Sequence, residues 1–429
     1  MIPYAPDKRV PDKRQNHTLI SYENQLLLFG GSGPYMPSVK MRASYNDLWS
    51  FDTQIEQWNQ LEPKGLAPKK RMNHVTCRLG CIMLTHGGFS TEGKIMLDDF
   101  NLYDIELQRW LNVVVTMNGH EVKSDAQYGA DQAIDDGSSH IMTQVGARQN
   151  HCAAAVYDQD YYNHKYKKAG RETRGRVMWS KERVFSHEEH AKQKSYHEGI
   201  YIFGGMNNKG HILNDLWLVQ PLHSSNKRVM SSYNHEYSGV SKEDPTLSLN
   251  IVKISDYSGQ PPCPRINAQM IHLNIKHSGH QLVVVYGGRN DKIFNSTGNV
   301  ALNDIAVFNC NLLSWEPLAM FGQMPCSRWS HTMIALSSTQ SYHEGLLIFG
   351  GVNLNAYCRS NFYTFSFSHK KVTESNQLND MLASSQVLST DPQSGHSRAK
   401  TTPKRNETTA TKENSSRAKQ QATATVTSP

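Results

Sequence analysis

Two stretches, SYHEGIYIFGG at 195–205 and SYHEGLLIFGG at 341–351, are spelled almost identically within one chain of 429 residues. Near-identity over eleven positions indicates a duplicated structural unit, because repeat architectures show themselves by a recurring order of elements. Both copies contain an apolar run that ends in Gly-Gly. That run is the element to follow along the rest of the chain.

The repeat has four elements in constant order. A segment headed by arginine comes first, followed by an apolar run ending in Gly-Gly, a polar pair that opens a second apolar run, and in three units a tryptophan segment. The glycine pairs are Gly30 and Gly31, Gly87 and Gly88, Gly204 and Gly205, Gly287 and Gly288, and Gly350 and Gly351. The tryptophans Trp58, Trp110 and Trp315 each lie eleven positions beyond an aspartate, at Asp47, Asp99 and Asp304. Five units of one kind are therefore predicted.

The elements have the character of strands. Each is a short run rich in Val, Ile, Leu, Phe and Tyr, bounded by Gly, Asn, Asp or Pro, which is typical of β-strands. Four short antiparallel strands repeated around an axis form the blades of a β-propeller, which leaves only short, protected sheet edges. The glycine pair ends the second strand, where a positive φ or a close backbone approach favours glycine. The sequence therefore predicts an all-β propeller.

With these elements the chain resembles the kelch-repeat family, whose signature is the same Gly-Gly followed by a spaced aromatic residue and tryptophan. The resemblance covers about residues 1–368 and implies a kelch-type β-propeller of four-stranded antiparallel blades, with the tryptophans packed between blades. We expect five blades, with six, the commoner number in the family, as the alternative. The expected blades are 14–62, 71–116, 148–254, 265–319, and 328–368 completed by residues 1–10.

Residues 1–10 are expected to close the ring as the outer strand of the last blade. The stretch 1–14 aligns without gaps with 58–71 and 315–328, which each contain a fourth strand and its exit loop. The fifth unit, in contrast, ends after its third strand. A strand from the N-terminus would remove an open sheet edge.

Four segments lie outside the repeats. Insertions are expected at 118–147, which is acidic, at 158–198 and at 221–247. Residues 370–429 form a Ser/Thr/Lys-rich tail, which we expect to be disordered because it buries too little apolar surface to offset its ordering entropy.

Composition limits the class of partner and the compartment. The net charge of +7 is mild for this length and makes nucleic acid an unlikely partner. The basic run 164–176 is interpreted as a solvated loop, with phosphate contact or nuclear targeting as the alternative. No run of 18 apolar residues and no apolar signal core occur, so a membrane partner is not expected. Reduced cysteines and a cytoplasmic location, with the nucleus as the alternative, are the prediction.

Catalytic and metal-binding patterns are weak. His187 and His190 would share a helical face with ligand spacing, but they lie in an insertion without a nearby cysteine, so no metal and no cofactor are expected. Two enzyme classes, copper radical oxidases and sialidases, use kelch-like propellers. Neither the Tyr, Cys and His copper ligands nor an arginine triad with a tyrosine nucleophile can be placed in this sequence. A propeller enzyme therefore stays as an alternative.

The arginine that heads each unit is the better candidate for a functional residue. Either it braces the junction between blades by hydrogen bonds to the backbone or to the polar pair, or the arginines form a ring of guanidiniums around one mouth of the channel. In an antiparallel blade, the loops between strands 2 and 3 emerge on the same face as the links between blades, and kelch substrate adaptors bind partners there. The partner-binding candidates are Arg14, Arg71, Arg148, Arg265, Arg328, Tyr35, Arg42, Arg289, Asn290, Tyr357 and Arg359.

These observations favour a non-catalytic protein-interaction module, acting as a scaffold or adaptor. Tyr and Arg are typical anchors of binding hot spots, and Arg grips carboxylates bidentately, which favours an acidic partner segment. The alternatives are a propeller enzyme of oxidase or sialidase type, and a substrate receptor of a ubiquitin ligase. No BTB or F-box pattern precedes the repeats to support the latter.

Overall fold

The structure is a computed structural model of the 429-residue chain. It describes residues 10–37, 40–117, 120–121, 145–157, 197–222, 246–275, 279–292, 300–322, 324–336, 344–353, 362–368 and 422–427. Within these ranges the chain folds into strands, bridges and turns, and none of it is a helix long and apolar enough to cross a bilayer. Most of the expected insertions and tail, and residues 1–9, lie outside the described residues.

The first two units fold as four-stranded antiparallel blades. Blade 1 consists of β1 (Thr18–Tyr22), β2 (Gln25–Phe29), β5 (Leu48–Asp52) and β6 (Gln57–Leu61). Blade 2 consists of β7 (Val75–Leu79), β8 (Ile82–His86), β11 (Phe100–Asp104) and β12 (Arg109–Met117), with β13 (His120–Glu121) beside β12. Each blade carries an extra hairpin after its second strand, β3 (Ser32–Met36) with β4 (Met41–Ser44), and β9 (Phe89–Ser90) with β10 (Ile95–Met96).

The remaining units have the same strand order. Blade 3 consists of β14 (Arg148–Gln149) and β15 (Cys152–Val156), β16 (Gly199–Asn207), β17 (Ile212–Leu222) and β18 (Thr246–Ile254). Its outer strand β18 also pairs in parallel with β12, so the strands of blades 2 and 3 form one ten-stranded sheet. Blade 4 consists of β19 (Gln269–Ile275), β20 (His280–Tyr286), β21 (Ile305–Asn309) and β22 (Ser314–Glu316). Blade 5 consists of β24 (Trp329–Leu336), β25 (Glu344–Val352), β26 (Phe362–Ser368) and β27 (Ala422–Thr427), and β23 (Leu318–Gly322) lies against β27.

In blades 2, 3 and 4 the second strand is a largely apolar run because both of its faces are covered. In β20, Val283 and Val285 pack in the cluster shared with blade 3, whereas Leu282 and Val284 pack in the cluster shared with blade 5. A strand buried on one side only would alternate apolar and polar residues. The apolar run LVVVY is therefore explained by the position of blade 4 between two other blades.

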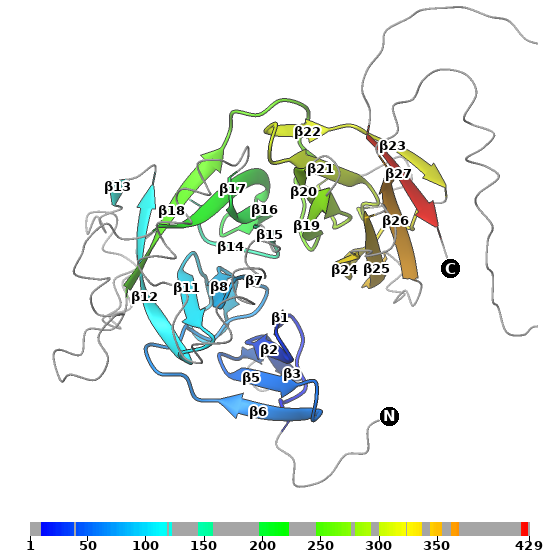
Figure 1. The fold of residues 1–429 in the computed structure, drawn as a ribbon. Coiled ribbons are helices and arrows are strands. Elements are labelled where there is room, and N and C mark those ends of the chain that lie inside the picture. Colours follow the sequence, from blue (N-terminus) through cyan, green and yellow to red (C-terminus); the bar gives the residue numbers. More distant parts are fainter. Residues whose placement is uncertain are drawn as a thin grey trace, which may run out of the picture.

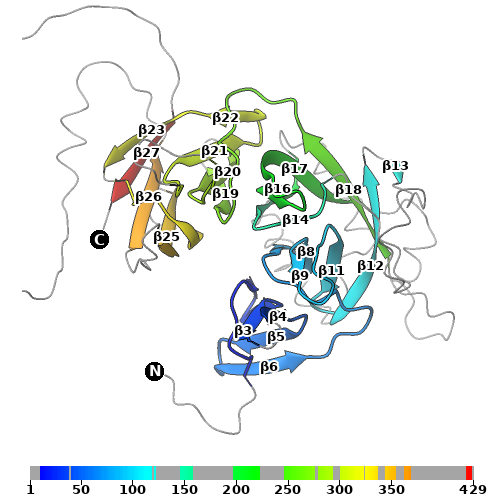
Figure 2. The same cartoon turned by 180° about the vertical axis from the view of Figure 1, so that it is seen from behind.

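The blades are arranged around a common centre, with their first strands innermost (Figures 1 and 2). The inner strands contact one another in the order β1, β7, β15, β19 and β24. Figure 1 shows the ring open between blade 5 and blade 1. Four blade boundaries are thus closed and one is open in the part of the chain that the structure describes.

Two backbone hydrogen bonds repeat at every closed boundary. The N–H of the second glycine of a pair donates to the carbonyl of the next blade's arginine, as from Gly205 to Arg265 over 2.9 Å. The residue two positions after each arginine has a positive φ, which is 57° in both Asn73 and Asn150. At each closed boundary its N–H donates to the carbonyl of the equivalent residue of the preceding blade. Asparagine tolerates this left-handed conformation better than most residues. The members of this ladder are Asn16, Asn73, Asn150, Asn267 and Ser330.

The outer strand of blade 5 differs from the prediction. Residues 422–427, which the sequence assigned to a disordered tail, form β27 and pair antiparallel with β26 from Thr364↔Thr427 to Ser368↔Thr423. This strand occupies the position that we expected for residues 1–10. The segment ATATVT alternates alanine or valine with threonine, and β-branched residues favour an extended backbone. This local preference explains why these residues form a strand at the edge of blade 5.

Candidate interaction face

The arginine that heads each unit reaches across its own blade. In blade 2, Arg71 donates from Nη1 to the carbonyl oxygen of Gly87 over 3.1 Å and forms a bidentate pair with Asp99 at 2.9 and 2.7 Å. A paired fork of this kind is among the strongest polar interactions in proteins. The same pair recurs as Arg14 with Asp47, Arg148 with Asp215, and Arg265 with Asp304.

Burial and the charge of the paired arginine shift the pKa of the aspartate in opposite directions in blades 1, 2 and 3. Removal of the Asp99 carboxylate from water raises its pKa, but the charge and hydrogen bonds of Arg71 outweigh that effect and hold the pKa well below its ordinary value. In blade 4, the Asp304 carboxylate likewise raises the pKa of Arg265 against the effect of burial. The pairs therefore remain ionised, and each stabilises its blade only while both partners are present.

The arginine side chains are buried and used within their own blades, so they do not present a ring of exposed cations. Arg328 in blade 5 is fully buried as well and donates to the carbonyl of Gly350 over 2.8 Å. The side chains therefore brace their own blades, and not the junction between blades as the bracing alternative expected, and their burial disfavours partner binding. This applies to Arg14, Arg71, Arg148, Arg265 and Arg328.

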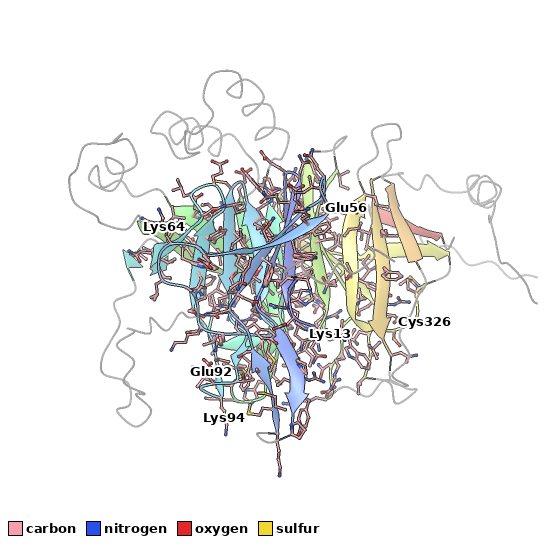
Figure 3. All side chains as sticks on the ribbon, turned by 90° about the horizontal axis from the view of Figure 1, so that it is seen from below. Lys13, Glu56, Lys64, Glu92, Lys94 and Cys326 are labelled. Carbon is pink, nitrogen blue, oxygen red and sulfur yellow. The ribbon has the colours of Figure 1, made fainter. Side chains whose placement is uncertain are left out.

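The same hydrogen bonds establish which loops share a face. At each arginine, the start of the first strand meets the end of the second strand and the start of the third. The link from the preceding blade ends at this arginine. In blade 2, the Arg71 N–H donates to the carbonyl of Tyr45, which lies just before the third strand of blade 1. We call this side of the ring the link face; it carries the hairpins β3–β4 and β9–β10 and the loop that begins at Arg289. Figure 3 shows Glu92 and Lys94 of the second hairpin projecting at one edge of the molecule, and Glu56 of the β5–β6 turn at the opposite edge.

Apolar side chains are exposed on the two hairpins. Tyr35 in β3 is 53% exposed, and Met36 beside it and Ile95 in β10 are also exposed. The hairpins are held together because the Ser44 N–H and hydroxyl contact the Thr91 hydroxyl at 3.0 and 2.9 Å. Large apolar side chains fixed on an exposed, hydrogen-bonded surface are characteristic of interaction sites.

The charges on the same hairpins are mostly positive. Lys40, Arg42 and Lys94 lie on them, against Glu92, which is paired with Lys70 at 2.6 Å. Arg42 lies across the hairpin from Tyr35 and donates to the carbonyl of Gly33, so part of its guanidinium is already used. We call the surface of Tyr35, Met36, Arg42, Lys94 and Ile95 the hairpin patch.

The other predicted binding residues are not gathered on this patch. Arg289 in blade 4 pairs with Asp291 at 2.6 Å and lies over the Trp329 ring at 5.2 Å. Asn290 is buried, and its amide donates to the carbonyl of Pro264, so its role is structural. Tyr357 and Arg359 lie outside the described residues.

The sequence interpretation missed Met36, Ile95 and Lys94. The signal for Met36 was present in YMPSVKM, where apolar residues flank a short turn inside a loop. Ile95 and Lys94 stand in the loop after the second glycine pair, which was not singled out because it lacks tyrosine and arginine.

A cavity lies against the inner strands of the ring. Its volume is about 360 Å³, and its polar residues are Ser21, Thr76, Arg78, Tyr157 and His272. Arg78 is engaged with the carbonyl of Gly80 at 2.6 Å. Among the described residues, no group of three or more His, Cys, Asp and Glu side chains is arranged to hold a metal ion; His187 and His190 lie outside them.

Comparisons with known proteins agree with this arrangement. Residues 2–129 match the family model of the KLHDC2/KLHL20/DRC7 Kelch-repeats domain. Kelch domain-containing protein 3 of Homo sapiens and of Bos taurus are each 30% identical to the chain over 100 residues, which is 23% of this chain and 25% of the relative. The alignment therefore spans about a quarter of these relatives' length.

Two further similarities are more limited. The flagellar outer-arm dynein alpha chain of Chlamydomonas reinhardtii is 29% identical over 111 residues, which is 25% of this chain and 2% of that protein. The solved structure of YjhT superposes with a TM-score of 0.45 at 11% identity, covering 84% of this chain and 82% of that one.

Proposed function

Because the chain belongs to the kelch-repeat family, whose members generally serve as protein-interaction modules, we propose that it is a non-catalytic binding protein that holds a partner segment on its link face. The observation that carries this proposal is the hairpin patch, in which Tyr35 is exposed on a hairpin anchored to its neighbour. A tyrosine fixed in this way supplies a large contact area at low entropic cost. The two hairpins and the braced blades beneath them give a rigid surface.

The charge of the hairpin patch supports an acidic partner segment. Lys94 is exposed, and no carboxylate of the two hairpins other than Glu92 opposes the three cations. A carboxylate of the partner would meet Arg42 or Lys94 while an apolar side chain packs against Tyr35 and Ile95. Opposite charges at such a rim raise the association rate and select the partner, and salt weakens both effects.

A displayed library of random 12-residue peptides tests the proposal and requires no identified partner. The full chain is the bait, and selected peptides are compared on Tyr35→Ala and on Ile55→Ala, which removes a side chain of similar exposure (58%) from the opposite face of the same blade. Loss of a hot-spot anchor costs about 2 kcal/mol or more, or roughly thirtyfold in Kd.

We expect the selected peptides to be rich in Asp and Glu, to weaken about thirtyfold on Tyr35→Ala, and to keep their affinity on Ile55→Ala. Peptides that bind both variants with the affinity of the parent chain would place the site elsewhere. Binding that is insensitive to salt would contradict the acidic partner while leaving the hairpin patch in place.

A further inference from the structure

Arg78 in β7 lines the cavity at the inner strands, and among the described residues no carboxylate pairs with it. Its Nη1 donates to the carbonyl of Gly80 over 2.6 Å, and its Nη2 lies 3.4 Å from the hydroxyl of Tyr157. A guanidinium has five N–H donors, so these two bonds leave part of the fork uncommitted. The arginines that head the blades differ, because each is bonded to an aspartate or to a glycine carbonyl of its own blade.

Aromatic residues of the two neighbouring blades hold the Arg78 guanidinium in place. Its Cζ lies 5.6 Å from the centre of the Tyr22 ring in blade 1, a distance at which the ring attracts a cation. Tyr157, which follows the last residue of β15, approaches from blade 3. The carboxylate of Glu106 accepts a hydrogen bond from the Tyr22 hydroxyl at 2.6 Å and forms no ion pair with Arg78. The guanidinium is therefore oriented, but no opposite charge neutralises it.

The room in front of Arg78 comes from small residues in β15. The position seven residues after the repeat arginine is Arg78 in blade 2 and Ala155 in blade 3. Two residues earlier in the same strands, Thr76 of blade 2 corresponds to Ala153 of blade 3. All four side chains line the cavity, so blade 3 supplies methyl groups where blade 2 supplies longer, polar side chains.

The remaining wall of the cavity is largely apolar and carries no second charge. Ile20, Ala154 and Met270 line it, and no described aspartate or glutamate does. Burial lowers the pKa of His272, another lining residue, so its ring is neutral at pH 7. The volume of about 360 Å³ lies at the lower end of the range found for small-ligand sites. The cavity thus combines one oriented cation with apolar walls.

We propose that this cavity binds a small carboxylic acid with an apolar body. The planar fork of Arg78 matches the two oxygens of a carboxylate, and such charge-assisted hydrogen bonds are among the strongest in proteins. The apolar body of the ligand lies against Ala153, Ala155 and Met270. Because the walls exclude part of the water, the ion pair is stronger there than on an open surface.

This site is separate from the hairpin patch and does not rest on the function proposed for that patch. The inner strands start at the link face, where the repeat arginines lie, and run away from it. Arg78 is seven residues beyond Arg71, and Tyr157 is nine residues beyond Arg148. The ligand therefore occupies the side of the ring away from the link face, and the two proposals fail independently.

Two methionines report separately on the two surfaces, because Met270 lines the cavity and Met36 belongs to the hairpin patch. The full chain is labelled with carbon-13 at its methionine methyl groups, and Met270→Leu and Met36→Leu assign the two resonances. Phenylacetate, phenylpropionate and phenylbutyrate are the probes, and the amide of each acid is its neutral control. Arg78→Gln removes the positive charge of the cavity, and Arg42→Gln removes one from the hairpin patch.

We expect at least one acid to shift the Met270 resonance saturably and to leave Met36 unchanged. Its amide should bind about tenfold or more weakly, and Arg78→Gln should weaken binding of the acid by a similar factor, because a charge-assisted hydrogen bond is lost. Arg42→Gln should leave the Kd unchanged.

Three results would overturn the proposal. They are no saturable shift of Met270 with any of the three acids, equal affinity for acid and amide, and binding that Arg42→Gln abolishes while Arg78→Gln preserves it. The comparison of acid with amide uses the parent chain, so the proposal can fail even where Arg78→Gln disturbs the fold.

Discussion

The boundary between blades 3 and 4 and the boundary between blades 5 and 1 are built from the same repeat positions. At the first, Phe203 lies 5.6 Å from Trp315 and Gly205 donates to the Arg265 carbonyl. At the second, Phe349 is exposed and Trp58 contacts Phe51 of its own blade at 5.1 Å. Identical residue types thus have different environments according to whether a neighbour is present.

The difference separates two kinds of stabilisation in the repeat. The arginine–aspartate pair lies within one blade, so it is formed in blade 1 at the open boundary as well as in blade 4 at a closed one. The aromatic contact lies between blades, so it depends on closure. A repeat protein is stabilised by both terms, one intrinsic to each unit and one between neighbours.

Removal of a buried arginine is expected to have the largest effect. Arg265→Met leaves the carboxylate of Asp304 and the carbonyl of Gly287 without their buried partner, and should lower the free energy of unfolding by about 3–5 kcal/mol. Lys70→Met removes an exposed ion pair with Glu92 and should cost less than about 1 kcal/mol. Urea unfolding followed by circular dichroism measures both. Equal, small costs would show that the arginines do not brace the blades.

Truncation of the repeated phenylalanine should distinguish the two boundaries. Phe203→Ala empties a fully buried position and is expected to cost about 3–5 kcal/mol, whereas Phe349→Ala removes a partly exposed ring and should cost less than about 2 kcal/mol. The urea midpoints of the two variants give the comparison. If Phe349→Ala were as costly as Phe203→Ala, the open boundary would have to be closed in solution.

Buried histidines at the closed boundaries should make stability pH-dependent. Burial, with the nearby Arg328 charge, lowers the pKa of His331 to about 3, whereas an unfolded histidine has an ordinary pKa near 6.5. Below about pH 6.5 the unfolded chain therefore binds protons that the folded chain does not, so stability falls as the pH decreases from 6.5 toward 3. The contribution of one such histidine between pH 7 and 5.5 is about 1 kcal/mol.

His331→Ala tests this effect because Ala268 occupies the same position in blade 4. The loss of stability from pH 7 to 5.5 should be about 1 kcal/mol smaller in the variant than in the parent chain, measured from urea midpoints at both pH values. An unchanged pH dependence would mean that His331 is not buried as a neutral ring.

Much of the fold could be predicted from the sequence. Runs such as LVVVY and the recurring Gly-Gly depend on local backbone geometry and on burial of both strand faces, which periodicity reports directly. The kelch-type, all-β architecture is confirmed by the family match and by the four-stranded units. The outer strand of blade 5 was missed because its residues follow a long polar stretch, so chain proximity gave no hint of its partner β26.

The candidate site was harder to predict, because exposure of a side chain depends on three-dimensional neighbours. Hydrogen bonds from the arginine to the backbone or to the polar pair were one of the two expected roles, but the spacing along the chain does not reveal that Arg71 and Asp99 meet as a buried pair within one blade. The strand order did place the loops between the second and third strands on one face. Within those loops, Tyr35 is exposed and Asn290 is buried, a difference that composition does not encode.

The most direct test of the difference between the boundaries is a pair of double-mutant cycles. One cycle combines Phe203→Ala with Trp315→Ala, and the other combines Phe349→Ala with Trp58→Ala, each analysed for the coupling free energy of unfolding. We predict a coupling of about 0.5–1.5 kcal/mol for the first pair, as for aromatic rings in contact, and none within error for the second. Equal coupling in both cycles would contradict the account, because Phe349 and Trp58 would then be in contact across a closed ring.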